Sequence, residues 1–194
     1  MNLREHDKRD DMKVWLSDQE VERLLDAASD TDHYLAYGLG VRCGLRSQEA
    51  LDAAPTHIVE TDAGYMLRIW EGKGDQYRET PVPQDLAARI QTVDDVRDAS
   101  SDEPLLDCSS RTLRRWVSKT AERLAVSEED EGWGYLSYHD LRRTWATNLG
   151  AQDVDPLIVL EWGGWNDLDT FLDHYRGVYS PEAQHREREK VAWL

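Results

Sequence analysis

The sequence predicts one α+β domain that is mostly helical and contains a small three-stranded antiparallel sheet. The first observation is length, because 194 residues are enough for one hydrophobic core and too few for two ordinary domains with a linker. The second is that apolar residues recur at helical spacing along most of the chain. The third is the stretch between Pro55 and Pro83, where short runs of β-forming residues are separated by turn-forming residues.

Three helices are predicted before the sheet. The first covers residues 17–28, because Ser17-Asp18-Gln19-Glu20 has the S-x-x-E spacing of a capping box and apolar residues follow at helical intervals. The second covers residues 32–43 and ends at Gly44. Ser47 is expected to cap a short third helix that runs to Leu51.

Residues 56–60, 65–70 and 76–82 are predicted to be the three strands, joined by glycine-containing turns in an antiparallel meander. A helix follows over residues 84–93. The acidic, serine-containing stretch 94–107 is expected to be a surface loop.

The second half of the chain is predicted to be helical. A helix that begins at Ser109 or Ser110 has one apolar stripe with basic residues along its edge. Four further helices are expected over about residues 139–147, 156–162, 166–175 and 182–193. The chain therefore divides into a charged leader or linker stub (1–14), a main domain (15–179) and a C-terminal helix (180–194).

The composition excludes several classes of protein. A net charge of −16 argues against coating nucleic acid through bulk charge, so any DNA binding has to be local. No stretch is apolar enough for a membrane span or a secretory signal, which favours a cytoplasmic protein. Cys43 and Cys108 have no C-x-x-C spacing, so neither a disulfide scaffold nor a cysteine metal site is expected.

Arginine is strongly preferred over lysine. Eighteen arginines accompany five lysines, and carboxylates are abundant. Such a surface repels itself in dilute buffer, whereas molar salt shortens the Debye length to about 3 Å and screens the repulsion. The composition therefore favours a halophilic protein, and the alternative is an acidic protein from a non-halophilic organism.

Two segments carry candidate cations. Arg46 follows Gly44 and precedes Glu49 by three residues, so a guanidinium fixed by a carboxylate could grip a phosphate; a surface ion pair is the alternative. Lys73 lies between two glycines at a predicted hairpin tip, where an ammonium could bind phosphate or donate a proton. A solvated turn lysine is the alternative there.

Two later segments carry a candidate base and a candidate nucleophile. His139 and Arg142 are three residues apart on one predicted helix, so both can face one point. The alternative is a capping histidine beside a solvated arginine. Trp165 and Tyr175 follow, and a tyrosine can attack phosphorus when cations stabilise its anion. Otherwise it is an amphipathic residue at the edge of the core.

The order of these residues resembles the catalytic domain of the tyrosine recombinases, the phage integrase family. The resemblance rests on the contexts GLRSQEAL, EGKGDQYRETPVP, YHDLRRTWATNL and GGWNDLDTFLDHY, which cover about residues 15 to 180. With the acidic, lysine-poor composition, the chain resembles a haloarchaeal member. The resemblance implies a helical bundle with a small three-stranded sheet.

The resemblance also implies a role for each candidate. Arg46 and Arg142 would clamp the non-bridging oxygens of the scissile phosphate, and Glu49 would orient Arg46. Lys73 would protonate the leaving 5′ oxygen. The remaining roles are general base or phosphate ligand for His139, indole N–H donor for Trp165, and nucleophile for Tyr175. The transesterification conserves the phosphodiester bond, so no metal and no nucleotide cofactor is expected.

Three departures from the family pattern matter. Tyr175 lies ten residues after Trp165, one more than is usual in the family, so Tyr179 remains an alternative nucleophile. Arg143 stands where many relatives have histidine. The family's N-terminal DNA-clamping domain is not seen, which indicates an excised catalytic domain or a naturally short enzyme.

We therefore expect a site-specific DNA recombinase that cleaves and rejoins double-stranded DNA through a 3′-phosphotyrosine. One alternative is a catalytically inactive DNA-binding remnant that regulates or occupies sites. A second alternative, which rests on the acidity alone, is a chain that binds only protein partners. Self-association on DNA is expected. The resemblance implies that the last helix docks on a neighbouring subunit, and docking on its own subunit is the alternative. The most basic segment of the chain is the first choice for phosphate contacts, and the predicted DNA-binding residues are Arg111, Arg114, Arg115, Lys119 and Arg143.

Overall fold

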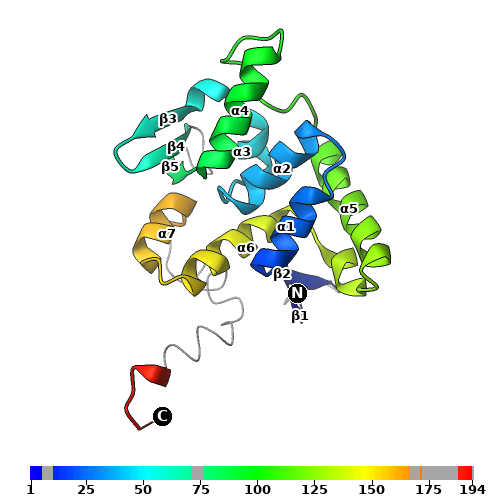
Figure 1. Ribbon diagram of the computed structural model, residues 1–194, viewed down its shortest axis with the longest axis vertical. Coiled ribbons are helices and arrows are strands. Elements are labelled where there is room, and N and C mark those ends of the chain that lie inside the picture. Colours follow the sequence, from blue (N-terminus) through cyan, green and yellow to red (C-terminus); the bar gives the residue numbers. More distant parts are fainter. Residues whose placement is uncertain (6–10, 71–76, 167–170, 172–187, 194) are drawn as a thin grey trace.

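The computed structural model describes residues 1–5, 11–70, 77–166, 171 and 188–193 (Figure 1). Its helices are α1 (Asp18–Asp26), α2 (Thr31–Val41), α3 (Ser47–Asp52), α4 (Gln84–Val96), α5 (Ser110–Ser127), α6 (Tyr138–Ala151) and α7 (Pro156–Gly163), with 3₁₀ turns η1 (Pro55–His57) and η2 (Glu131–Tyr135). Its strands are β1 (Asn2–Glu5), β2 (Met12–Trp15), β3 (Ile58–Thr61), β4 (Gly64–Ile69) and β5 (Arg78–Pro81). The prediction of a mostly helical domain with a small antiparallel sheet is confirmed.

The first helices form for local reasons that the sequence contains. Ser17 caps α1, accepting from the Glu20 backbone N–H at 3.4 Å, while the Glu20 carboxylate accepts from the Ser17 N–H at 2.8 Å. After α2 the chain turns at Gly44 with a φ of +68°. A Cβ there would lie 2.3 Å from the Trp145 ring, so only glycine fits the conformation and the space.

The sheet has the order β3-β4-β5 and is antiparallel throughout. Leu67 of β4 lies opposite Ile58 and Thr80, and β5 directs Arg78 and Thr80 to the buried side. Thr56 belongs to η1, so the first predicted strand begins two residues late. The sheet and α4 lie at one end of the domain in Figure 1, with α7 packed against β5.

The interior has two apolar clusters. The larger one joins α1, α2, α4, α5 and the start of α6 with the inner face of the sheet. The smaller one lies between α6, α7 and the following segment and contains Trp145, Ala146, Val159, Trp165 and Phe171. The smaller cluster packs the end of α7 against α6. The candidate residues Arg142 and Trp165 lie at this contact.

Three local expectations differ from the structure. The segment 1–14, expected as a charged leader, contains an antiparallel ribbon in which Asn2 lies opposite Trp15, and Val14 is fully buried. Arg46, not Ser47, is the N-cap residue of α3. The expected surface loop 94–107 begins inside α4 and ends on the core, because Leu105 and Leu106 are buried.

Some expectations fall outside the described residues. Most of the helices predicted over 166–175 and 182–193 lie there, as does the turn that contains Lys73. Within the described residues, no helix is both long and apolar enough to cross a membrane. Cys43 and Cys108 are free thiols.

Candidate active site

Arg46 is oriented by a carboxylate on its own helix. The Glu49 side chain accepts the Arg46 backbone N–H at 2.7 Å and the Arg46 Nη1 donor at 2.6 Å. This reciprocal contact arises because the N-cap and the third helical residue face each other in the first turn. The Arg46 side chain keeps 26% of its surface exposed, so its guanidinium can meet a ligand.

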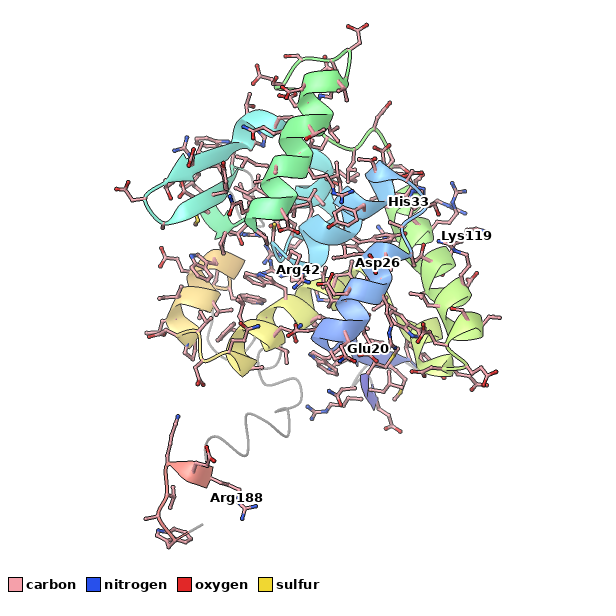
Figure 2. The ribbon with its side chains drawn as sticks, in the orientation of Figure 1. Glu20, Asp26, His33, Arg42, Lys119 and Arg188 are labelled. Atoms are coloured by element: carbon pink, nitrogen blue, oxygen red, sulfur yellow. The ribbon has the colours of Figure 1, made fainter. Side chains whose placement is uncertain are left out.

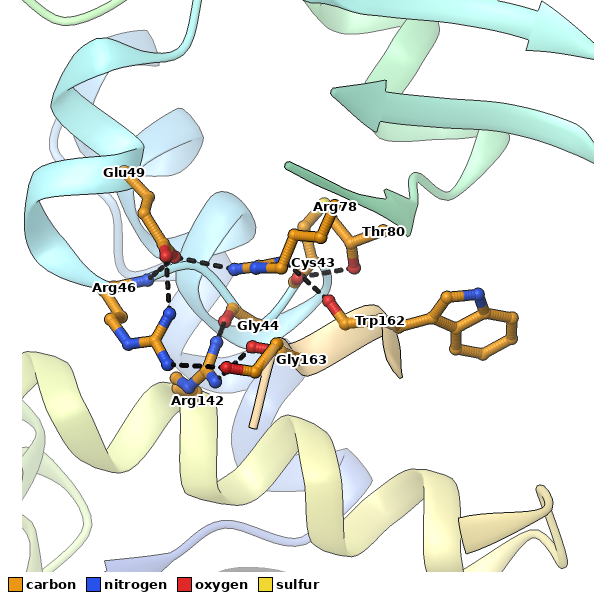
Figure 3. A network of polar contacts seen from close by, with 10 residues as sticks. Cys43, Gly44, Arg46, Glu49, Arg78, Thr80, Arg142, Trp162 and Gly163 are labelled. Carbon is orange, nitrogen blue, oxygen red and sulfur yellow. Dashed lines mark hydrogen bonds and ion pairs between the residues drawn. The ribbon is translucent and has the colours of Figure 1, made fainter. Parts of the chain in front are cut away.

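Arg142 approaches the same place from α6 and is only 1% exposed. Its Nη1 donates to the Gly44 carbonyl at 2.6 Å, and its Nη2 donates to the Gly163 carbonyl at 2.5 Å. The guanidinium carbon lies 4.1 Å from the centre of a Trp165 ring, which is a cation–π distance. Arg142 therefore joins the turn after α2 to the end of α7 (Figure 3).

Sequence reasoning missed a third arginine, Arg78 on β5. Its Nη2 donates to the Glu49 carboxylate at 2.7 Å, and its Nη1 donates to the Trp162 carbonyl at 2.6 Å. Arg78 lies inside the EGKGDQYRETPVP segment. Alternation on the predicted strand puts it on the same face as Thr80 and Val82, and all three are buried. An arginine on the inward face of a predicted strand is the signal by which the sequence could have identified Arg78.

The end of α7 is held by all three arginines. Trp162, Gly163 and Gly164 are consecutive, and their carbonyl oxygens accept from Arg78, Arg142 and Arg46 respectively. The last carbonyls of a helix lack partners inside the helix and carry the negative end of its dipole, so guanidinium donors stabilise them. Gly164 takes the left-handed conformation at the C-cap, with a φ of +63°.

Within the group formed by Arg46, Glu49, Arg78 and Arg142, positive charge exceeds negative charge, while Glu79 and Glu161 line the neighbouring cleft. Burial, together with the charges of Arg46 and Arg78, lowers the pKa of Arg142 well below its ordinary value. Burial alone would raise the pKa of Glu49, but the charges of Arg78, Arg46 and Arg142, together with the hydrogen bond from the Arg46 backbone, outweigh burial and lower it. Three guanidinium groups surround one carboxylate, so the group has an excess of positive charge. An anion would relieve this excess.

A cleft of about 440 Å³ opens beside this group. Its walls are the sheet, the start of α3 and the end of α7, and it is lined by Arg46, Met66, Tyr77, Arg78, Glu79, Leu160, Glu161, Trp162, Gly164, Trp165 and Asn166. The cleft is large enough for a phosphate with its attached sugars. The site can therefore bind an anion at Arg46 and present it to groups around the cleft.

The other candidates are placed as follows. His139 lies in the first turn of α6, three residues before Arg142, with its side chain exposed, and it is not part of the cleft lining. Trp165 lines the cleft. Lys73, Tyr175 and Tyr179 lie outside the described residues. The structure thus brings Arg46, Glu49, Arg142 and Trp165 together.

The predicted DNA-binding residues fall into two environments. On α5, Arg111, Arg114, Arg115 and Lys119 are exposed, and Lys119 projects from the edge of the molecule (Figure 2). Arg143, in contrast, pairs with Asp140 on its own helix and keeps only 12% of its side chain exposed. Within the described residues, no group of three or more metal-ligating side chains occurs.

Comparisons with known proteins show the family of the chain. The model of the phage integrase family matches residues 14–181. The tyrosine recombinase XerD of Neisseria meningitidis is 30% identical over 172 residues, which cover 80% of this chain and 55% of the relative. The tyrosine recombinase XerA of Thermococcus kodakarensis is 26% identical over 165 residues. The chain thus spans about half the length of the curated relatives it matches.

Solved structures share the fold. A crystal structure of XerA recombinase superposes with a TM-score of 0.74 and 19% identity, covering 92% of this chain and 65% of that one. The catalytic domain of bacteriophage HP1 integrase superposes with a TM-score of 0.62 and 17% identity, covering 93% of this chain and 96% of that one. At these identities the likeness concerns the fold.

Proposed function

Since this chain belongs to the phage integrase family, we propose that it is the catalytic part of a site-specific DNA recombinase, which cleaves and rejoins DNA through a 3′-phosphotyrosyl intermediate. One observation carries the proposal. Arg46 and Arg142, from separate helices, donate to the adjacent carbonyls of Gly164 and Gly163, and Glu49 orients Arg46 at the mouth of a cleft. Such a pair of guanidinium groups suits a phosphodiester.

The reaction assigns a role to each arginine. In the transition state, negative charge grows on the non-bridging oxygens of the phosphate, and preorganised cations stabilise it. Arg46 is exposed enough to donate directly. Arg142 is buried, so it acts through its charge until the Gly163 carbonyl gives up its hydrogen bond, after which its guanidinium can also contact the phosphate.

The covalent step exchanges one ester for another. The Tyr175 oxygen forms a bond to phosphorus while the bond from phosphorus to the 5′ oxygen breaks. His139 accepts the phenol proton or binds the phosphate, Lys73 donates a proton to the 5′ oxygen, and Trp165 donates through its indole N–H. The number of phosphoester bonds is unchanged, so rejoining is the same step in reverse with no energy source. Tyr179 is the alternative nucleophile.

We assign DNA contacts to α5. In an acidic chain α5 presents four exposed cations between Arg111 and Lys119. Phosphate contacts of this kind fix a protein on a duplex without reading its sequence. The partially buried Arg143 is the weaker member of the predicted set, because Asp140 already neutralises it. The set is Arg111, Arg114, Arg115, Lys119 and Arg143.

We also propose how the chain is organised into domains, how it assembles and in which setting it acts. We infer a catalytic domain over residues 15–179, and a C-terminal helix (180–194) that docks on a neighbouring subunit assembled on DNA. We also propose a cytoplasmic protein of haloarchaeal, halophilic type. The excess of eighteen arginines over five lysines and the net charge of −16 support the halophilic character.

A nicked suicide duplex in concentrated KCl tests the proposal. Such a duplex loses the short 5′ fragment after cleavage, so the covalent protein–DNA adduct accumulates and is seen as a shifted band under denaturing conditions. We expect an adduct with the wild type and none with Tyr175→Phe, whereas Tyr179→Phe keeps it. DNA retention without an adduct would favour the non-catalytic DNA-binding alternative, and neither adduct nor retention would refute both.

A further inference from the structure

Arg78 is a buried cation that the proposed reaction does not use. Its side chain is 5% exposed, and both of its terminal nitrogens are committed, one to Glu49 and one to the Trp162 carbonyl. Its Nε is buried and has no hydrogen-bond partner within the part of the chain that the structure describes. Both terminal nitrogens of Arg78 are therefore held by other parts of the protein, Nη2 by Glu49 and Nη1 by the end of α7.

Arg78 affects the orientation of Arg46 because both side chains are bound to the Glu49 carboxylate. The two carboxylate oxygens divide their partners: Oε1 accepts from the Arg46 guanidinium, and Oε2 accepts from the Arg46 backbone and from Arg78. A carboxylate held at both oxygens cannot rotate away from Arg46. Figure 3 shows the three side chains in this order, with Glu49 between the two arginines.

Arg78 also reaches the end of α7. Besides its bond to the Trp162 carbonyl, its side chain packs on Gly164, where a Cβ would lie 2.5 Å from the Arg78 Cδ. The Gly164 carbonyl accepts from Arg46. Arg78 thus fixes both groups that hold Arg46, the Glu49 carboxylate and the end of α7.

We propose that Arg78 is a positioning residue of the phosphate site, which holds the Glu49 carboxylate and the end of α7 in place so that Arg46 is aimed at the scissile phosphate. The proposal rests on the function proposed above. Lysine would not replace it fully, because one ammonium lacks the planar fork that reaches Glu49 and the Trp162 carbonyl together.

The role has a pH signature. Burial raises the pKa of Glu49, and the charge of Arg78 is the largest influence that lowers it. Without Arg78, Glu49 takes up a proton at a higher pH and releases Arg46. The other charges that act on the Glu49 carboxylate are those of Arg46 on its own helix and Arg142 on α6. A second cavity beside Glu49 is lined by further titratable or charged groups, namely Asp52, His57 and Arg68.

The test compares Arg78→Met, Arg78→Lys and the control Arg89→Met, which removes an exposed arginine that lies over the Tyr34 ring. Single-turnover adduct formation is measured against DNA concentration and pH. For Arg78→Met we expect a maximal rate lower by about 10- to 100-fold, as for the loss of a supporting hydrogen-bond partner in metal sites. We expect little change in the DNA concentration at half-maximal rate, and an acidic limb of the pH profile moved to higher pH.

Two variants keep the result interpretable. Arg78→Lys restores the counter-charge, so its acidic limb returns toward that of the wild type while its rate recovers only in part; Arg89→Met matches the wild type. If Arg78→Met is folded and has the wild-type rate and pH profile, the proposal is overturned. It is equally overturned if Arg78→Met and Arg89→Met lose rate alike.

A second measurement separates this proposal from the proposed function. The guanidinium ¹⁵N–¹H signals of Arg46 report its contact with Glu49 and need no reaction. We expect them to exchange faster with water in Arg78→Met than in the wild type, and to be unaffected in Arg89→Met. Unchanged Arg46 signals overturn the positioning role whatever the adduct assay shows, whereas absence of any wild-type adduct overturns the proposed function alone.

Discussion

The substitution Gly44→Ala tests the turn on which the site is built. At Gly44 the φ is +68°, and a Cβ would lie 2.3, 2.5 and 2.7 Å from three atoms of the Trp145 ring. The left-handed conformation costs about 1–2 kcal/mol for a residue other than glycine. Forcing a methyl group into a packed ring costs about 1–3 kcal/mol more. We therefore expect the free energy of unfolding to fall by about 2–5 kcal/mol, a large part of a typical total.

Two other glycines provide matched controls. Gly64 has a φ of +100°, and a Cβ there would meet nothing within 4 Å, so Gly64→Ala measures the backbone cost alone. Gly134 has open space and is not among the positive-φ glycines, so Gly134→Ala should change stability by less than about 0.5 kcal/mol. Urea unfolding of the three variants at one KCl concentration gives the comparison.

The difference between the first two variants is the packing cost at Trp145. If the free energy of unfolding falls no further in Gly44→Ala than in Gly64→Ala, the close approach of position 44 to the Trp145 ring is refuted. A further effect is expected on the site, because the Gly44 carbonyl accepts from Arg142. Adduct formation by the folded fraction should fall in Gly44→Ala and stay unchanged in the other two.

Three more predictions follow from other contacts. Ser17→Ala removes the capping-box oxygen of α1 and should lower the free energy of unfolding by about 1 kcal/mol in urea titrations; no change would mean that the cap is dispensable. Glu49 has a folded-state pKa below its ordinary 4.5, so its contribution to stability is present above about pH 4.5 and is lost as pH falls through the folded-state value. Urea titrations from pH 6 to 3 should therefore show a smaller loss of stability for Glu49→Gln than for the wild type, and equal losses would contradict this. Arg142→Gln should lower single-turnover cleavage by about 100- to 1,000-fold, as for loss of one oxyanion donor, while duplex retention in filter binding persists; a rate within tenfold of the wild type would exclude its proposed role.

Local signals made most of the fold predictable. The contacts that define α1 join Ser17 to Glu20, and those that orient Arg46 join it to Glu49, so each can be read within one helical turn. The three strands were equally visible from their turn-forming neighbours. These elements required no knowledge of distant residues.

The features that were missed depend on distant partners. Arg78 is explained by Glu49 and by the Trp162 carbonyl, which lie far from it in sequence. The ribbon β1–β2 begins with an exposed strand in which Leu3 is the single apolar residue, so the strand has no alternation of apolar and polar residues. Leu105 and Leu106 lie in a stretch of acidic and serine residues, and only the assembled core shows that they are buried.

The tripeptide 162–164 also limits how this chain can vary in length. Each of its carbonyls is matched to one guanidinium, and the three guanidinium groups come from β5, α6 and the start of α3. An inserted or deleted residue between Trp162 and Gly164 would leave at least one arginine opposite the wrong atom. Natural variants should therefore tolerate insertions before Pro156 more readily than within this tripeptide.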